Sequence, residues 1–150
     1  MVSNDTPAPI LLAEDEENDV LFMRLAFKKA GLEHPLIAVP DGERAIEYLD
    51  GSGPYADRQR FPLPCLILTD LKMPRVNGFE ILTWLESRPH LRHIPVIVLS
   101  SSSHEEDERR ALELGARAYW VKPSQIQVLI DLVKHMRDTW VAAHCSAGRG

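Results

Sequence analysis

Five short, wholly apolar runs recur along the chain between stretches of mixed polarity. They are residues 10–13, 36–39, 65–68, 96–99 and 118–121. A run that is apolar throughout, instead of alternating with polar residues, is typical of a strand covered on both of its faces. The pattern therefore predicts five buried strands.

The segments between these runs have helical patterns, and the residues expected to open them are capping or turn residues: Asn18 or Asp19, Asp41, Asn77, Ser103 and Ser124. Glu106 and Gln127 follow the two serines at the spacing of a capping box. Strands that alternate with helices through short loops imply right-handed crossovers and a parallel sheet with helices on both faces. We therefore predict a doubly wound α/β fold of five parallel strands and five helices.

The length of the chain, 150 residues, is that of one ordinary domain. We expect a single domain over residues 1–150, with a core of about residues 8–140, a short N-terminal arm and a frayed C-terminal tail, "AAHCSAGRG". Residues 51–64 are rich in Pro, Gly and Arg, and we interpret them as a surface excursion before the third strand.

The composition disfavours membrane proteins and proteins that bind nucleic acid. Apolar residues make up 45% of the chain and charged residues 26%, and no secretory or membrane-length apolar run occurs. We therefore expect a soluble, cytoplasmic protein with no membrane partner. The formal charge of -5 disfavours direct binding to nucleic acid, which requires clustered Lys and Arg.

The cysteines and histidines suggest no disulfide and no zinc site. Cys65 and Cys145 have neither the number nor the spacing of a disulfide framework or a zinc motif. We interpret Cys65 as a buried apolar residue and Cys145 as a free thiol. His90 and His93 are the only close pair of histidines, and they fall short of the ligand count of a metal site.

Polar side chains follow four of the five apolar runs. Glu14 and Asp15 come after the first, Asp70 after the third, Ser100 after the fourth and Lys122 after the fifth. The carboxyl ends of parallel strands share one edge of the sheet, and such folds bind their ligands there. One such residue alone is more often a helix cap or a loop residue. Their joint occurrence at four strand ends favours a functional site.

These residue types predict phosphoryl chemistry. Three carboxylates within a few ångströms cannot all stay ionised without a cation, and Mg²⁺ is a hard ion that bridges carboxylate and phosphate oxygens. An ionised Asp70 can itself attack phosphorus to give an aspartyl phosphate. The Lys122 ammonium and the Ser100 hydroxyl could then neutralise and orient the phosphoryl oxygens.

Four fragments together carry a family resemblance: "LLAEDEEND", "LILTDLKMPRVNGFEIL", "IPVIVLSSS" and "GARAYWVKPS". In this order and spacing they resemble the receiver domain of two-component response regulators, over about residues 10–137. The resemblance implies the flavodoxin-like strand order 2-1-3-4-5. It also implies that Asp70 is the phosphoacceptor, and that Glu14 and Asp15 are the acidic pair that binds Mg²⁺.

Further roles follow from the same resemblance. The backbone carbonyl of Lys72 would complete the Mg²⁺ shell, and Lys122 would be the family's active-site lysine, before a proline that the family often has in cis. Ser100 would be the switch hydroxyl and Tyr119 the switch aromatic. Glu14 replaces a commoner Asp, while Lys72 and Ser102 stand at the rim of the site. These departures leave the lifetime of the phosphorylated state open.

A narrower resemblance suggests partners. Residues 48–74 followed by residues 100–123 are similar to the small stand-alone response regulators that pair with bacterial phytochrome histidine kinases. It implies a histidine kinase partner, with a bacteriophytochrome as the candidate, and leaves a histidine phosphotransfer protein open as a further partner. We expect no output domain after Arg137, and we therefore expect the signal to leave by contact, through the fourth helix, fifth strand and fifth helix.

A homodimer through that same face is one expectation, because it carries a group of large apolar residues: Trp120, Leu132, Val133, Met136 and Trp140. The alternative is that all of them except Trp140 are core or covered residues.

Two other functions keep the fold but change the chemistry. One is an adaptor whose acidic pocket is vestigial, although the complete set of pocket residues speaks against it. The other is a Mg²⁺-dependent phosphohydrolase with an Asp nucleophile, as in the haloacid dehalogenase family. That family needs a second Asp two residues after the first, where this chain has Lys72. Flavin or nucleotide binding lacks a Gly-rich phosphate loop after the first strand.

Overall fold

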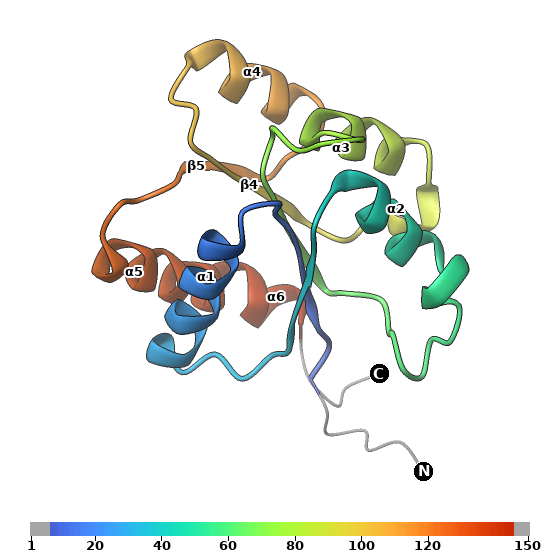
Figure 1. Ribbon diagram of the computed structural model, residues 1–150, viewed down its shortest axis with the longest axis horizontal. Coiled ribbons are helices and arrows are strands. Elements are labelled where there is room, and N and C mark those ends of the chain that lie inside the picture. Colours follow the sequence, from blue (N-terminus) through green and yellow to red (C-terminus); the bar gives the residue numbers. More distant parts are fainter. Residues whose placement is uncertain (1–6, 146–150) are drawn as a thin grey trace.

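A central parallel sheet separates two layers of helices in the computed structural model, which describes residues 7–145 (Figure 1). The strands are β1 (Ile10–Ala13), β2 (Leu36–Val39), β3 (Leu66–Thr69), β4 (Val96–Ser100) and β5 (Ala118–Val121). Their order is β2-β1-β3-β4-β5, and every neighbouring pair is parallel. The predicted doubly wound fold and its strand order are confirmed.

The helices cover both faces of the sheet. They are α1 (Glu17–Ala30), α2 (Gly42–Asp50), α3 (Gly78–Glu86), α4 (Glu105–Glu113), α5 (Ile126–Met136) and the short α6 (Ala142–His144). A π-helical turn, Arg137–Val141, joins α5 to α6, and 3-10 turns occupy Gly53–Tyr55 and Pro89–Leu91. Helices α1 and α5 lie on one side of the sheet, and α2, α3 and α4 lie on the other (Figure 1).

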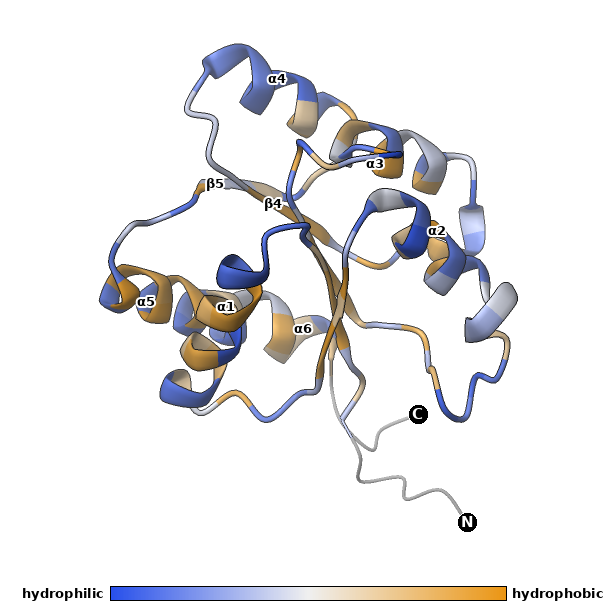
Figure 2. Ribbon diagram, viewed as in Figure 1, coloured by the Kyte–Doolittle hydropathy of each residue, from blue (hydrophilic) through white to orange (hydrophobic). Residues whose placement is uncertain are grey.

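The apolar strands feed two separate cores. In β1, Ile10 and Leu12 pack in the α1 and α5 cluster, while Leu11 and Ala13 pack in the cluster under α2, α3 and α4. Alternate side chains thus enter opposite cores, which is why the strands are apolar at every position. Figure 2 shows these apolar strands, and it shows α4 as largely hydrophilic.

Helix starts were predictable where a side chain caps the helix. The Asp41 carboxylate accepts a hydrogen bond from the Arg44 N–H at 2.8 Å, and Asn77 forms a capping box with Glu80 at the start of α3. The other predicted starts were wrong. Helix α1 begins before Asn18, and α4 and α5 begin after His104 and Gln125.

The three displaced helix starts have no side-chain cap. Before α4, the Ser102 hydroxyl, and not that of Ser103, accepts from the His104 N–H at 3.3 Å. The predicted capping boxes at Ser103 and Ser124 therefore do not form. The contacts of the preceding loops, and not local capping, decide where these helices begin.

The excursion at residues 51–64 is a surface segment fastened to α2. The Arg58 guanidinium donates to the carbonyls of Tyr48, Leu49 and Phe61 at 2.8 to 3.1 Å. The rings of Tyr48, Tyr55 and Phe61 pack against one another, with centroids 5.0 to 6.1 Å apart. Burial raises the pKa of the Tyr48 hydroxyl to about 12, and this hydroxyl donates to the Pro62 carbonyl.

The prediction for the cysteines was wrong. Cys65 and Cys145 form a disulfide, with their Cα atoms 5.2 Å apart and a sequence separation of 80. Cys145 is buried, and its N–H donates to the Val141 carbonyl, so the end of the chain is helical as far as α6 instead of frayed. Val141 packs in the α1 and α5 core, and this packing carries Cys145 back to the start of β3. The expected N-terminal arm and the rest of the tail lie outside the described residues.

Within residues 7–145, none of the helices is long and apolar enough to cross a bilayer.

The disulfide should stabilise the fold, because it closes a long loop in the unfolded chain. We expect reduction to lower the free energy of unfolding by about 4 kcal/mol, and the thermal midpoint by about 10 °C. Thermal unfolding followed by circular dichroism, with and without a phosphine reductant, measures both. The double variant Cys65→Ser/Cys145→Ser is the control, since the reductant should not change its midpoint. Equal midpoints for the oxidised and reduced wild type would contradict a stabilising bridge.

Candidate functional site

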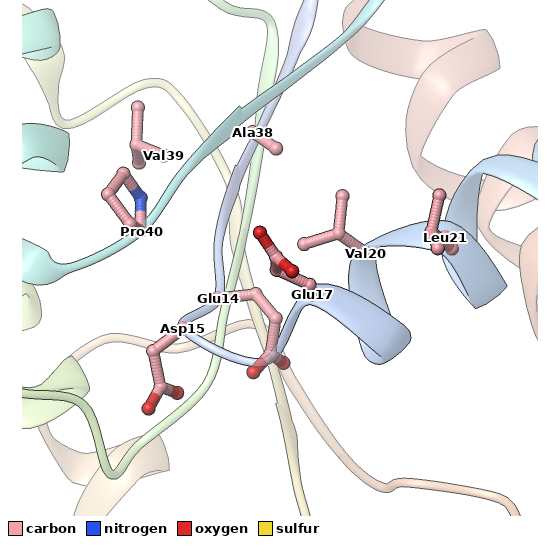
Figure 3. A pocket seen from close by; sticks show the side chains of 8 residues that line it. All are labelled: Glu14, Asp15, Glu17, Val20, Leu21, Ala38, Val39 and Pro40. Atoms are coloured by element: carbon pink, nitrogen blue, oxygen red, sulfur yellow. The ribbon is translucent and has the colours of Figure 1, made fainter.

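The three predicted acidic residues meet at the carboxyl edge of the sheet. Glu14 and Asp15 follow β1, Asp70 follows β3, and one carboxylate oxygen of each lies within 4.8 Å of the other two. Figure 3 shows the Glu14 and Asp15 side chains leaving the end of β1 in the same general direction. Glu14 and Asp70 are buried, whereas Asp15 is exposed.

The Asp70 carboxylate is held at both of its oxygens. The Leu71 N–H donates to Oδ1 at 2.7 Å, and the Lys122 ammonium donates to Oδ2 at 2.9 Å. The Thr69 hydroxyl donates to the Asp70 carbonyl at 2.8 Å and so secures the backbone at the strand end. Hydrogen bonds from charged and backbone donors orient this carboxylate.

Two glycines let the helix starts approach the loop that follows Asp70. A Cβ atom on Gly78 would lie 2.3 Å from the Asp70 carbonyl oxygen, and one on Gly42 would lie 2.0 Å from the Val76 carbonyl oxygen. No side chain fits at either position, so the first residues of α2 and α3 must be glycine. The Gly78 N–H donates to the Leu71 carbonyl at 2.9 Å, which closes the loop over the site.

The ammonium of Lys122 joins three carboxylates. It lies 2.8 Å from a Glu14 oxygen, 2.8 Å from an Asp19 oxygen and 2.9 Å from an Asp70 oxygen. Burial alone would lower the pKa of Lys122, but hydrogen bonds to these carboxylates raise it above its ordinary value. Lys122 therefore stays charged throughout the physiological range.

Asp19 is a member of the site that sequence reasoning missed. It was considered only as a helix cap, yet it lies in the first turn of α1 and reaches a lysine 103 residues away. Its one sequence signal was membership of the acidic stretch "EDEEND" after the first strand.

Glu14 has the most perturbed carboxyl group of the cluster. Burial raises its pKa to about 7, although the hydrogen bond from Lys122 acts in the opposite direction. Its second oxygen accepts from the Glu16 N–H at 3.1 Å. Both carboxylate oxygens of Glu14 are thus held by hydrogen bonds.

The donor set fits a hard divalent cation. The Lys122 ammonium contacts the carboxylates of Glu14, Asp19 and Asp70. Carboxylate oxygens of Glu14, Asp15 and Asp70 lie within reach of a single ion. An uncompensated cluster of buried carboxylates is costly, and a divalent ion with oxygen ligands removes that cost. The Lys72 side chain is exposed.

The two predicted switch residues meet in the loop between β4 and α4. Ser100 is buried, and its hydroxyl accepts from the Ser102 N–H at 3.1 Å. The Tyr119 hydroxyl donates to the Ser102 carbonyl at 2.8 Å. The Ser102 hydroxyl donates to the Asp107 carboxylate in the first turn of α4 at 2.6 Å. Ser102 thus links the strand end, the aromatic ring and the helix, a role that its sequence position did not indicate.

Two further predictions concern the histidine pair and the peptide bond before Pro123. His90 and His93 are both exposed, and neither belongs to a group of possible metal ligands among the described residues. The peptide bond before Pro123 is trans, since residues 7–145 contain no cis peptide bond.

Known proteins share this arrangement. Residues 10–134 match the model of the response regulator receiver domain. The response regulator Rcp1 of Synechocystis is 33% identical over 138 residues, which are 92% of each chain.

Solved structures of response regulators are similar to this chain in fold. The phosphorylated cyanobacterial phytochrome response regulator RcpA superposes with a TM-score of 0.82 at 33% identity, over 91% of this chain and 95% of that one. The Mn²⁺-bound form of Rcp1 has a TM-score of 0.79 at 34% identity, over 89% of this chain and 94% of that one. The family match, the sheet order and the acidic cluster agree, and this chain therefore belongs to the response regulator receiver domain family.

Proposed function

We propose that Asp70 accepts a phosphoryl group from the phosphohistidine of a histidine kinase, in a reaction that requires Mg²⁺. The observation that carries the proposal is the setting of Asp70. Its carboxylate is buried at the end of β3, hydrogen-bonded to the Lys122 ammonium, and beside the carboxylates of Glu14 and Asp15. The Mn²⁺-bound form of the similar protein Rcp1 supports a divalent ion in this family.

Each group has a distinct part in the transfer. An Asp70 oxygen forms a bond to phosphorus while the bond between phosphorus and the histidine nitrogen of the kinase breaks, and the bond electrons stay on that nitrogen. The Lys122 ammonium, already 2.9 Å from Asp70, neutralises charge on the transferred group. Glu14, Asp15, Asp70 and the Lys72 carbonyl would hold Mg²⁺, which supplies further neutralisation when bound.

The partner of this reaction is a histidine kinase, and we propose a phytochrome kinase in particular. Similar proteins are described as phytochrome and bacteriophytochrome response regulators. Onward transfer to a histidine phosphotransfer protein is consistent with the same chemistry. A cytoplasmic location would suit this partnership. The comparisons do not support a phosphohydrolase, and the exposed Lys72 occupies the position where that reaction needs a second carboxylate.

Phosphorylation should depend on both Asp70 and Mg²⁺. We expect one phosphoryl group to add to the wild type during incubation with a small phosphodonor and Mg²⁺, because the carboxylate is the nucleophile. Asp70→Asn should gain none, and intact-protein mass spectrometry measures the difference. Asp57→Asn is a matched control, since Asp57 is an exposed carboxylate in the excursion. No mass gain in folded wild type would contradict the proposal and favour the phosphorylation-independent adaptor.

We further propose that the phosphoryl group acts through the loop between β4 and α4. A phosphoryl oxygen that accepts from the Ser100 hydroxyl favours one loop position, and Tyr119 reports that position because it bonds to Ser102. Asp107 transmits the movement to α4 through its bond from the Ser102 hydroxyl. The loop therefore couples the site to the face of α4, β5 and α5.

Removal of the Tyr119 hydroxyl should uncouple the loop without stopping phosphorylation. We expect Tyr119→Phe to gain the phosphoryl group as the wild type does, yet to lose at least half of the phosphorylation-dependent change in amide exchange at residues 100–107. Hydrogen exchange by mass spectrometry measures the change. Tyr55→Phe, in the excursion, is the matched control. An unaltered exchange response in Tyr119→Phe would contradict the coupling.

The same face could join two copies of the chain. Val133 and Met136 are buried in the core, and Trp120 and Trp140 are partly covered by it, so most of the predicted dimer residues have partners within the chain. However, Leu112 of α4, Val121 of β5 and Val128 of α5 are 43%, 46% and 45% exposed. We propose a homodimer built on these three residues.

Light scattering over a wide concentration range, with and without phosphorylation, tests the dimer. We expect Val121→Glu to shift the protein to monomer, because the new charge would be buried without a partner. Leu63→Glu is the control, since Leu63 is 37% exposed in the excursion. A wild type that stays monomeric in both phosphorylation states would contradict the dimer.

A further inference from the structure

A second cluster of possible metal ligands lies at the opposite edge of the sheet. Ligand atoms of His34, Cys65 and Cys145 all lie within 4.8 Å of one another. His34 stands in the turn before β2, Cys65 immediately before β3, and Cys145 immediately after α6. Residues distant in the sequence thus form one compact group at the amino ends of the strands.

The hydrogen bond of His34 prepares its ring for a metal. Its Nδ1 atom lies 2.9 Å from the Ala8 carbonyl oxygen. A carbonyl can only accept, so Nδ1 carries the proton and the lone pair is on Nε2. Histidines that bind metals commonly donate their other ring nitrogen to a carbonyl or a carboxylate, which fixes the tautomer and the ring orientation.

The thiols are available to a metal only in the reduced protein, since the structure joins them as a disulfide. Disulfides persist in oxidising compartments and are rare in the cytosol, which is the location we expect for this chain. Reduction by a small thiol transfers two electrons to the S–S bond and yields two cysteine thiols and an oxidised small-molecule disulfide. The reduced pair then stands beside an imidazole that is already oriented.

We propose that the reduced protein binds Zn²⁺ through the thiolates of Cys65 and Cys145 and the Nε2 atom of His34. Two thiolates balance the charge of the ion, and the two thiol protons leave to solvent on binding. Two Cys and one His are a common zinc donor set, with a water in the fourth position. His34 also lines a surface cleft of about 440 Å³. The metal then holds α6 to the start of β3 in place of the disulfide.

Cobalt is the probe, because a thiolate bound to Co²⁺ produces a near-ultraviolet charge-transfer absorption that carboxylate ligands do not. The wild type is reduced with a phosphine, freed of the reductant without air, and titrated with Co²⁺. We expect this absorption to saturate at one ion per chain, to disappear when Zn²⁺ is added, and to be absent from the oxidised protein.

Single substitutions assign the ligands. Cys145→Ser should lose most of the absorption, and His34→Ala, which keeps both thiols, should weaken Co²⁺ binding by roughly tenfold or more. His90→Ala and His93→Ala are controls with exposed side chains, and they should titrate as the wild type does. Circular dichroism of each reduced protein verifies its fold before titration.

Two results would overturn the proposal. One is a reduced, folded wild type that gains no charge-transfer absorption with Co²⁺. The other is a His34→Ala variant that binds Co²⁺ as tightly as the wild type does. Neither measurement depends on phosphorylation of Asp70. The zinc proposal and the phosphorylation proposal are therefore tested independently.

Discussion

The ion group around Lys122 is the interaction on which the functional end of the molecule depends. One ammonium contacts the carboxylates of Glu14, Asp19 and Asp70, and two of these three residues are buried. Buried like charges are tolerated only with a compensating cation. The contacts of the Lys122 ammonium therefore hold the ends of β1, β3 and β5 and the start of α1 together. The compensation is incomplete, and this imbalance makes the site suited to a divalent ion and an incoming phosphoryl group.

The charged residues of the site and the loop after β4 are held by different numbers of contacts. Asp70 is fixed by backbone contacts, and Gly42 and Gly78 admit helix starts that leave no room for a side chain. In the loop after β4, by contrast, Ser102 is held by single hydrogen bonds that can be exchanged one at a time. This difference supports the proposal that phosphorylation shifts the loop and leaves the acceptor in place.

The carboxyl ends and the amino ends of the strands carry different types of metal ligand. Hard carboxylate oxygens gather at the carboxyl ends of the strands, and two sulfurs and an imidazole gather at the amino ends. Hard oxygen ligands favour magnesium, and softer sulfur and nitrogen ligands favour zinc. The two proposed metal sites would therefore lie at opposite ends of the strands.

The sequence pattern predicted the features that depend on neighbouring residues, namely the strands and the helix caps. Apolar runs predicted each strand to within one residue, because burial on both faces requires apolar side chains at every position. Asp41 and Asn77 marked their helices correctly because a cap is a contact between near neighbours. The same reasoning placed Glu14, Asp15, Asp70, Ser100 and Lys122 at strand ends, and the rules of parallel sheets brought those ends to one edge.

Only the tertiary structure decided the contacts between distant residues. Asp19 resembled a helix cap until the fold set it against a lysine 103 residues away. Cys65 and Cys145 carried no recognisable spacing, and they meet because packing of Val141 returns the chain end to β3. Such pairings depend on the summed geometry of several elements and leave no periodic trace in the sequence. The sequence thus determined which residues line each strand end, and the packed fold decided which of them touch.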